Sequence, residues 1–300
     1  MQQQTLTSSE SARQLAQLID FMADRRRLLV LTGAGCSTDS GIPAYRDEQA
    51  NWQRKPPMFL QEFLRSQLAR QRYWARSLLG WPAFAAARPN AAHLALAQLE
   101  RQGRLHWLIT QNVDGLHQRA GSERISDLHG RLDTVECLNC GLLGSRAALQ
   151  EELLALNPDW GARTAALAPD GDAELEAADF AEFRVPDCPR CGGLLKPAVV
   201  FFGEQVPRAR VAFCLERLRE ADGLLVVGSS LAVWSGYRFV RAAVQEGTPV
   251  ALVNLGRTRA DAEATLKLEV SCSAVLPAVA TALAGGVADA SLPTVLAPQR

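Results

Sequence analysis

Four cysteines form two pairs whose spacing suits a metal ion. Cys137 and Cys140 are separated by two residues, as are Cys188 and Cys191, and a glycine follows each pair. Two such knuckles let four thiolates surround one Zn²⁺ tetrahedrally, which leaves no open position for a substrate. The sequence therefore predicts a structural zinc site. Two unrelated thiol pairs, or a redox Cys-x-x-Cys motif, are the alternative interpretations.

A second group of residues begins with a glycine-rich loop that follows the apolar run LLVLT at 28–32. Gly33 and Gly35 would let the backbone approach a phosphate, although GAG alone is equally typical of a tight strand-to-helix turn. Three further apolar runs, at 107–110, 224–228 and 250–255, also end in small or polar residues: Gln111, Asn112 and Asp114; Ser229 and Ser230; and Asn254. Because the carboxyl ends of parallel strands meet at one edge of a sheet, these residues predict a cleft for a polar dinucleotide.

Helical patterns alternate with these runs, and the alternation predicts an α/β fold with a doubly wound, Rossmann-like parallel sheet. Helices are expected within 11–24, 208–220 and 236–246. We expect a dinucleotide-binding domain made of residues 1–49, 91–130 and 197–300, a helical insert at 50–90 and a zinc-binding module at 131–196. The Ala-, Asp- and Glu-rich segment 161–187 is expected to be a surface loop with a short helix.

Length and composition exclude several classes of protein. Three hundred residues, 48% hydrophobic and 21% charged, allow one large core with a smaller module. Lys plus Arg and Asp plus Glu both number 32, so the overall charge favours neither nucleic acid nor an anionic membrane. No apolar run has the length of a membrane span, and the first residues show no signal pattern. The odd number of cysteines, seven, predicts a reducing compartment, the cytoplasm.

Taken together, the motifs resemble those of the sirtuins, which are NAD-dependent protein deacylases. The resemblance runs in order from about residue 27 to residue 276 and rests on GAGCSTDSGIPAYRD, TQNVDGLH, LHG at 128–130, the cysteine pairs, VVFFGE at 199–204, GSSLAV and VN at 253–254. Three further segments, RQRYWARSLLGW at 70–81, NPDW at 157–160 and LAPDGD at 167–172, are similar to the class II branch, which includes the mitochondrial lipoamidase-type sirtuin.

The resemblance implies that NAD is consumed as a co-substrate. The carbonyl oxygen of an acyl-lysine would attack the nicotinamide ribose, nicotinamide would leave, and the acyl group would pass through an alkylimidate to 2′-O-acyl-ADP-ribose. A base must take the proton of the ribose 2′-hydroxyl, and histidine titrates near neutrality. Of the four histidines, His129 matches the sirtuin base. His93 is interpreted as a packing or surface residue, His106 as the start of a strand, and His117 as a helix residue near the cleft.

The resemblance also assigns roles around this base. Asn112 would orient the ribose or the attacking water, and Asp114 would hold the nicotinamide carboxamide. Further NAD contacts are expected from the glycine loop, the second strand end and the adenosine side, namely Gly33, Ala34, Gly35, Ser37, Ile42, Pro43, Tyr45, Arg46, Gln53, Gln111, Val113, Gly228, Ser229, Ser230, Asn254, Leu255, Gly256 and Cys272.

The substrate peptide is expected to lie between Gly203–Glu204 and Ala232–Val233, where it would add a strand held by its backbone. Tyr73 and Arg76 share one face of a predicted helix and resemble the pair with which some sirtuins bind carboxylate-bearing acyl groups. A solvated arginine beside a packed tyrosine is an equal alternative.

Two departures from the family pattern bear on the substrate. The chain reads GIPAYR where the common spelling is GIPDFR, so Ala44 replaces an acid, and plain deacetylation is expected to be less efficient. It also reads GSSLAVWSG where a proline usually follows GSSLxV, so the peptide clamp is expected to differ in shape. Outside the zinc pairs, Cys214 is expected in the core and Cys36 as a small filler of the glycine loop.

Other functions stay open at this point. Mono-ADP-ribosyl transfer and lipoamide hydrolysis would use the same NAD cleft. A dehydrogenase would share the strands and the GAG loop, but no group of residues for hydride transfer is evident. We expect the acylated lysines of proteins as partners, and neither nucleic acid nor membrane, whereas the oligomeric state does not follow from the sequence.

Overall fold

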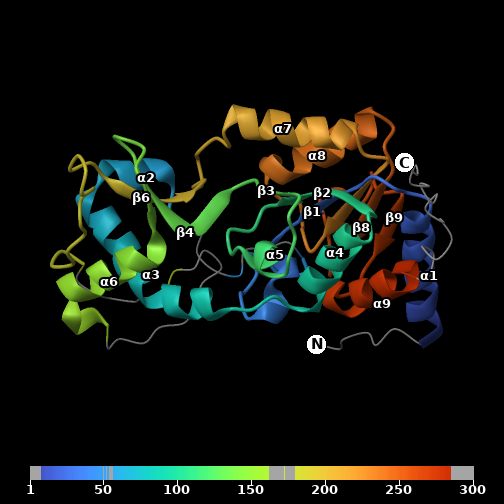
Figure 1. Cartoon of the computed structure of the whole chain (residues 1–300), viewed down its shortest axis with the longest axis horizontal. Coiled ribbons are helices and arrows are strands. Elements are labelled where there is room, and N and C mark those ends of the chain that lie inside the picture. Colours follow the sequence, from blue (N-terminus) through green and yellow to red (C-terminus); the bar gives the residue numbers. More distant parts are fainter. Residues whose placement is uncertain are drawn as a thin grey trace, which may run out of the picture.

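The computed structural model describes residues 8–49, 51, 53, 57–161, 172 and 180–284. Its larger part is built on a six-stranded sheet in the order β3-β2-β1-β7-β8-β9 (Figure 1). The strands are β1 (Leu28–Thr32), β2 (Leu105–Thr110), β3 (Ile125–Asp127), β7 (Gly223–Val227), β8 (Val250–Val253) and β9 (Leu266–Leu268). All neighbouring pairs are parallel. The chain continues from β1 to β2 on one side of it, and β7 later pairs with β1 on the other side. The carboxyl end of β1 is therefore the topological switch point, where such sheets bind ligands.

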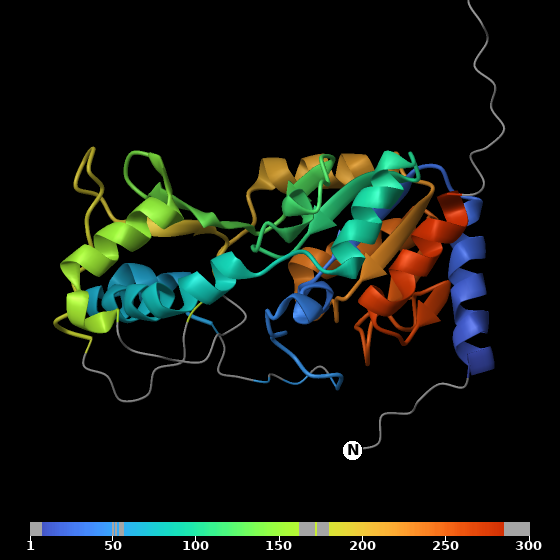
Figure 2. The same cartoon turned by 60° about the horizontal axis from the view of Figure 1, so that its bottom comes forward.

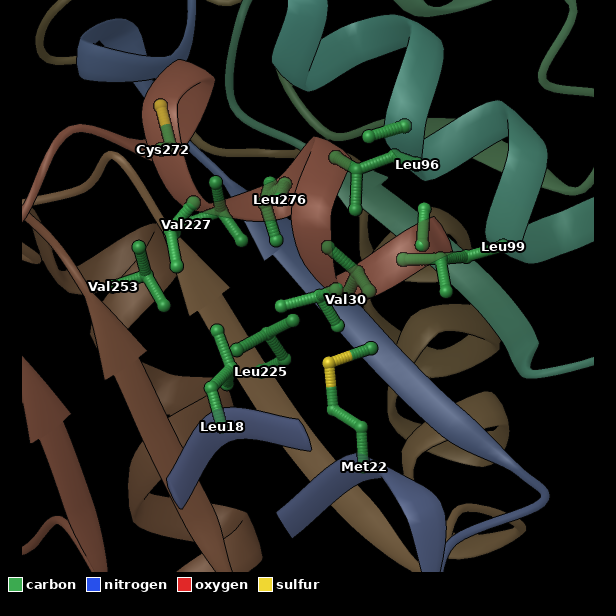
Figure 3. Packing of buried hydrophobic residues seen from close by; sticks show 14 of the residues in the cluster. Leu18, Met22, Val30, Leu96, Leu99, Leu225, Val227, Val253, Cys272 and Leu276 are labelled. Atoms are coloured by element: carbon green, nitrogen blue, oxygen red, sulfur yellow. The ribbon is translucent and has the colours of Figure 1, made fainter. Parts of the chain in front are cut away.

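Helices cover both faces of this sheet. On one face α1 (Ser8–Ala23), α4 (Ala91–Arg101) and α9 (Cys272–Ala284) pack on the strands, and Figure 3 shows Leu18, Leu96 and Leu276 converging on Val30 and Leu225. On the other face lie α7 (Arg208–Arg219) and α8 (Trp234–Gln245). Because alternate residues of a strand point to opposite faces, a strand covered on both sides reads as an unbroken apolar run.

A smaller module lies at the end of the molecule opposite α1 (Figures 1 and 2). It contains the antiparallel sheet β5-β4-β6 and the helices α2, α3 and α6. The bounds are β4 (Gly130–Cys137), β5 (Leu143–Ser145), β6 (Leu195–Val199), α2 (Leu60–Arg65), α3 (Gln67–Ala86) and α6 (Arg146–Leu156). Both predicted inserts share one apolar cluster, in which Phe63 and Trp74 from the helices meet Val135, Leu153 and Phe201. Four short elements complete the fold: η1 (Ala34–Cys36), η2 (Thr38–Ser40), α5 (Leu116–Arg119) and η3 (Pro158–Trp160).

The α/β class, the doubly wound parallel sheet and the four predicted strands are confirmed, as are the helices at the three expected places. The sequence analysis missed β3 and β9, each three residues long, because such short strands show no measurable periodicity. It also missed the small antiparallel sheet. Most of segment 161–187 lies outside the described residues. Among the described helices, none has the length and apolar character that crossing a membrane requires.

Candidate functional site

A cavity of about 1020 Å³ lies at the carboxyl edge of the six-stranded sheet, facing the small module. Its walls are the segments that follow β1, β2, β7 and β8, together with residues 42–48 and 199–206. The predicted NAD and peptide contacts all line this cavity except Gly256 and Arg76. The convergence of four strand ends that the sequence predicted is therefore observed.

The glycine loop is fixed against the segment that follows β7. Gly33 N donates to Val227 O at 3.1 Å, and Gly35 N donates to Gly228 O at 2.8 Å. A Cβ atom on Gly33 would lie 2.7 Å from Ser229 Cβ, and one on Gly228 would lie only 2.3 Å from the backbone nitrogen of Cys36 in the glycine loop. Because no side chain fits between the two backbones, glycine is required at both positions.

A chain of hydrogen bonds joins the glycine loop to the end of β2. Asn112 Nδ2 donates to Gly33 O and to Ser37 Oγ, at 3.0 Å each. Ser37 Oγ donates to Asp114 Oδ2 at 2.7 Å, and Asp114 Oδ1 accepts the backbone N–H of Leu116 at 2.8 Å. Burial raises the pKa of Asp114, against the opposing effect of these bonds. The three polar side chains thus hold one another in fixed positions on the cavity wall.

His129 lines the cavity, and its two ring nitrogens have different partners. Its Nδ1 lies 2.9 Å from Gln111 O, and a carbonyl can only accept, so Nδ1 carries the proton. Nε2 is then the basic nitrogen, and it lies 2.8 Å from the hydroxyl of Ser235. Burial lowers the pKa of His129 to about 4, below the near-neutral value that the sequence analysis expected. The imidazole is therefore neutral at physiological pH, and Nε2 is the ring nitrogen whose lone pair can accept a proton.

The other three histidines lie away from the cavity, and all four belong to the described part of the chain. His93 and His117 are buried with their ring centroids 4.6 Å apart. Burial lowers the pKa of His93 to about 4 and that of His117 well below its usual range. His106 Nε2 lies 2.9 Å from Glu220 Oε2. His93 and His117 are therefore core residues, and His106 lies against the carboxylate of Glu220.

On the side predicted for adenosine, the Ser229 hydroxyl accepts a hydrogen bond from Gln111 Nε2 at 2.8 Å. Asn254 Nδ2 donates to Leu255 O at 2.7 Å. Gly256 does not line the cavity; it has φ +78°, and a Cβ there would lie 2.2 Å from Glu48 O. Its assignment as a ligand contact stays a prediction, and the structure shows that a glycine here lets the segment around Glu48 approach closely.

On the side predicted for the peptide, the side chain of Glu204 is held within its own turn. Its Oε2 accepts the backbone N–H of Phe201 at 2.8 Å and lies 3.3 Å from Lys196 Nζ. Lys196 is almost completely buried. What Gly203 and Glu204 offer to the cavity is therefore mainly backbone, as the clamp prediction requires.

Of the predicted pair Tyr73 and Arg76, Tyr73 is the residue that lines the cavity. Tyr73 lines it and packs against Phe63 and Phe201, with ring centroids 5.5 and 5.3 Å apart. Arg76, one turn further along α3, is absent from the lining. The wall of the cavity at Tyr73 is therefore aromatic, and the role of Arg76 in binding an acyl group stays a prediction.

The four predicted zinc ligands come together in the small module. Cys137 Sγ lies 3.5 Å from Cys191 Sγ, Cys140 Sγ lies 3.8 Å from Cys188 Sγ, and all four sulfurs lie within 4.8 Å of one another. Tetrahedral Zn²⁺ with bonds of about 2.3 Å requires sulfurs about 3.8 Å apart. The donor set and its dimensions fit one Zn²⁺. Notably, β4 begins directly after His129 and ends at Cys137.

Ser235 is one of the cavity residues that were not predicted from the sequence. It lies at the start of α8 and makes the contact to His129 Nε2 described above. The available signal was the absence of proline in GSSLAVWSG, which the sequence analysis related only to the shape of the peptide clamp. The contact itself joins residues 106 positions apart and has no local signature.

Comparison with known proteins gives consistent matches. The model of the Sir2 family matches residues 33–235. An NAD-dependent protein deacetylase of Bordetella bronchiseptica is 57% identical over 265 residues, 88% of this chain and 97% of that protein. The mitochondrial NAD-dependent protein lipoamidase sirtuin-4 of Bos taurus is 51% identical over 263 residues, 86% of this chain and 83% of that protein.

Solved structures agree with this pattern. A structure of Sir2 with a p53 peptide and NAD⁺ is similar with a TM-score of 0.71 at 29% identity, covering 91% of this chain and 99% of that one. A Sir2 homologue in complex with NAD has a TM-score of 0.70 at 29% identity, covering 90% and 94%.

Proposed function

The chain belongs to the Sir2 family, and from this premise we propose how its cavity carries out NAD-dependent deacetylation of protein lysines. The chain is an NAD-dependent protein deacetylase of the sirtuin type. Its co-substrate is NAD, which supplies the ribose that accepts the acyl group as nicotinamide leaves. The roles of individual residues below are our assignment.

One observation carries the assignment of the base. His129 lines the cavity with Nδ1 fixed on Gln111 O and Nε2 on the hydroxyl of Ser235, and its ring is neutral. A neutral imidazole with a defined tautomer accepts a proton only at Nε2, so His129 is assigned as the general base for the ribose hydroxyl. The low pKa limits the strength of this base in the free protein. A ligand that carries negative phosphates into the cavity would raise it.

The polar residues of the β2 end would hold the two halves of the co-substrate. Asn112 and Asp114 are already oriented by Ser37, so little freedom is lost when a ligand binds. The loop at Gly33–Gly35, with its free space above the backbone, would take the pyrophosphate. Ser229 and Asn254 would contact the adenosine part.

The zinc ion would be held by Cys137, Cys140, Cys188 and Cys191 and would stabilise the small module, with no part in the reaction. We propose the domain division of the sequence analysis with one change. The helical and zinc-binding inserts form a single unit because they share one apolar cluster, and the cavity lies between this unit and the six-stranded sheet.

Two finer assignments follow from other observations. The protein substrates are proposed to be acylated on lysine and bound through their backbone at Gly203–Glu204 and Ala232–Val233. The cytoplasm is the proposed location, since all seven cysteines are unpaired and a four-thiolate zinc site requires reduced sulfur.

The test follows both products of one turnover. The protein is incubated with NAD and a panel of acylated lysine peptides, and nicotinamide and deacylated peptide are measured together. Equal yields are expected. Nicotinamide released while labelled ADP-ribose is transferred to protein would instead indicate mono-ADP-ribosyl transfer, and reduced cofactor would indicate a dehydrogenase.

A variant tests the assignment of His129 as the base. His129→Asn should leave NAD binding measurable while turnover falls by about 100-fold or more.

A second activity, removal of lipoyl or other long acyl groups, is favoured by the aromatic wall. Tyr73 and Phe201 line the cavity together with Met58, whereas Arg76 is not among the described residues that line it. A relative is named a lipoamidase. The same peptide panel, with lipoyl, octanoyl, acetyl and succinyl groups, tests the preference: we expect the apolar chains to exceed succinyl in kcat/KM.

A further inference from the structure

Two cysteines that take no part in the proposed proton transfer lie together beneath the glycine loop. Cys36 ends η1, and Cys272 is the first residue of α9. The Cys272 thiol donates to Gly35 O, the carbonyl directly before Cys36, at 3.6 Å. Both side chains belong to the same apolar cluster, with exposures of 0% and 5%. Figure 3 shows Cys272 at the end of α9 above Val227.

The two sulfurs differ in access and in acidity. Cys272 lines the cavity, whereas Cys36 lies behind it. The hydrogen bond from Cys36 lowers the pKa of Cys272, and its position at the N-terminus of α9 also favours the thiolate. The same contact, together with burial, raises the pKa of Cys36. The sulfur that a small solute can reach is therefore the more readily ionised one.

We propose that Cys36 and Cys272 are a redox-active pair: hydrogen peroxide that enters the cavity converts them to a disulfide that lowers the affinity for NAD. In the first step the Cys272 thiolate attacks one peroxide oxygen, the O–O bond breaks, and Cys272 sulfenic acid and hydroxide form. In the second step the Cys36 thiol gives its proton to that hydroxide, which becomes the first water, and the Cys36 thiolate attacks the sulfenic sulfur and releases a second hydroxide. This hydroxide takes up the proton that Cys272 lost on ionising and becomes the second water. Two thiols thus lose two electrons and two protons, and one peroxide becomes two waters.

The position of the pair links this bond to the ligand site. Gly35, the neighbour of Cys36, donates to Gly228 O at 2.8 Å, and this bond fixes the loop assigned to the pyrophosphate. A covalent S–S bond is shorter than a contact between thiols, so its formation draws η1 toward α9 and away from Gly228. The formation of the disulfide is independent of the proposed function, whereas its effect on the affinity for NAD rests on that function.

The experiment treats the zinc-loaded full chain with increasing hydrogen peroxide, stops the reaction with catalase and alkylates the remaining thiols. We expect a mass loss of two hydrogens and a peptide cross-link between Cys36 and Cys272. The KM for NAD should rise about tenfold in step with the cross-link and return to its starting value with dithiothreitol. Zinc release, followed with a chelating dye, should begin only at higher peroxide. Saturating NAD should slow the cross-link because Cys272 lines the cavity.

Matched variants separate this pair from other thiols. Cys36→Ala should keep its turnover, give no cross-link, and accumulate a sulfenic acid at Cys272 that dimedone traps. Cys214→Ala, which removes another buried thiol, should still form the cross-link. The proposal is overturned if zinc is lost before any cross-link appears, or if the reversible rise in KM is the same in Cys36→Ala. Failure of untreated protein to release nicotinamide would contradict the proposed function instead and would leave the mass result intact.

Discussion

The Ser235 hydroxyl lies 2.8 Å from Nε2 of His129, on the one nitrogen of that ring that can accept a proton. Since Nδ1 is bound to Gln111 O, the serine must donate this hydrogen bond. In the free protein the base is therefore covered by a hydroxyl from α8, and the ribose hydroxyl has to displace it or pass its proton through it.

Replacing this serine should change the pH dependence of turnover. A donor on Nε2 stabilises the neutral imidazole, so Ser235→Ala should raise the pKa of His129. The acid limb of the kcat/KM profile should then move to higher pH by about 0.5–1 unit. Ser235→Thr, which keeps the hydroxyl, should retain the wild-type limb. An unchanged profile in Ser235→Ala would mean that the contact has no influence on the base.

Because the loops after β1 and β7 are in contact, alanine substitutions at two glycines should have very different effects on stability. Gly33→Ala places a Cβ 2.7 Å from Ser229 Cβ, so the two loops must separate. We expect a loss of stability of about 1–3 kcal/mol and loss of measurable NAD binding. Gly144→Ala, whose Cβ would meet no atom within 4 Å, is the control and should change stability by less than about 0.5 kcal/mol. Urea unfolding and calorimetric titration with NAD measure both. Equal behaviour of the two variants would show that the loops are not in fixed contact.

Zinc should be present at one ion per chain and should be structural. Cys188→Ser should lose the ion, lower the melting temperature and abolish turnover, because the module that the metal stabilises also carries Phe201 on the cavity wall. Cys214→Ala should keep the full zinc content. Metal analysis, thermal unfolding and nicotinamide release are the measurements. Turnover by a zinc-free chain at the wild-type rate would contradict a module that shapes the cavity.

Stability should fall with acid through His93. Burial holds its pKa at about 4, while the same residue in the unfolded chain has a pKa near its usual 6.5. Between these values the unfolded chain binds a proton that the folded chain does not, so the free energy of unfolding decreases as the pH falls through this window. The loss amounts to about 1.3 kcal/mol between roughly pH 7.5 and 5.5.

The variant that tests this is His93→Gln. The His93 side chain accepts a hydrogen bond from Asn90 N in the capping box of α4, and glutamine preserves such a box. Urea unfolding at the two pH values should show a smaller decrease for the variant than for the wild-type chain. An identical decrease would assign the acid sensitivity to other groups.

Much of the fold was predictable because its signals are local. The core strands are unbroken apolar runs between helical patterns, and the cysteine knuckles and the residues after each strand stand together in the sequence. The convergence at the cavity then follows from the parallel order of the sheet, with no knowledge of side-chain contacts.

What escaped prediction depends on distant contacts. The direction of Arg76 depends on how α3 packs against the small module, and helical spacing alone places it only on the face of Tyr73. The pairing of Ser235 with His129, and of Cys36 with Cys272, joins segments that meet only after the whole sheet has formed. The low pKa of His129 likewise reflects burial, which the residue type does not report.

Strand β4 begins directly after the base, His129, and ends at Cys137 of the metal site. The base and the metal site therefore lie at the two ends of one strand, and between them stand Gly130, with φ +81°, and an irregular register between Gly130 and Val135. Loss of the metal should therefore affect the imidazole by loosening the strand that follows it.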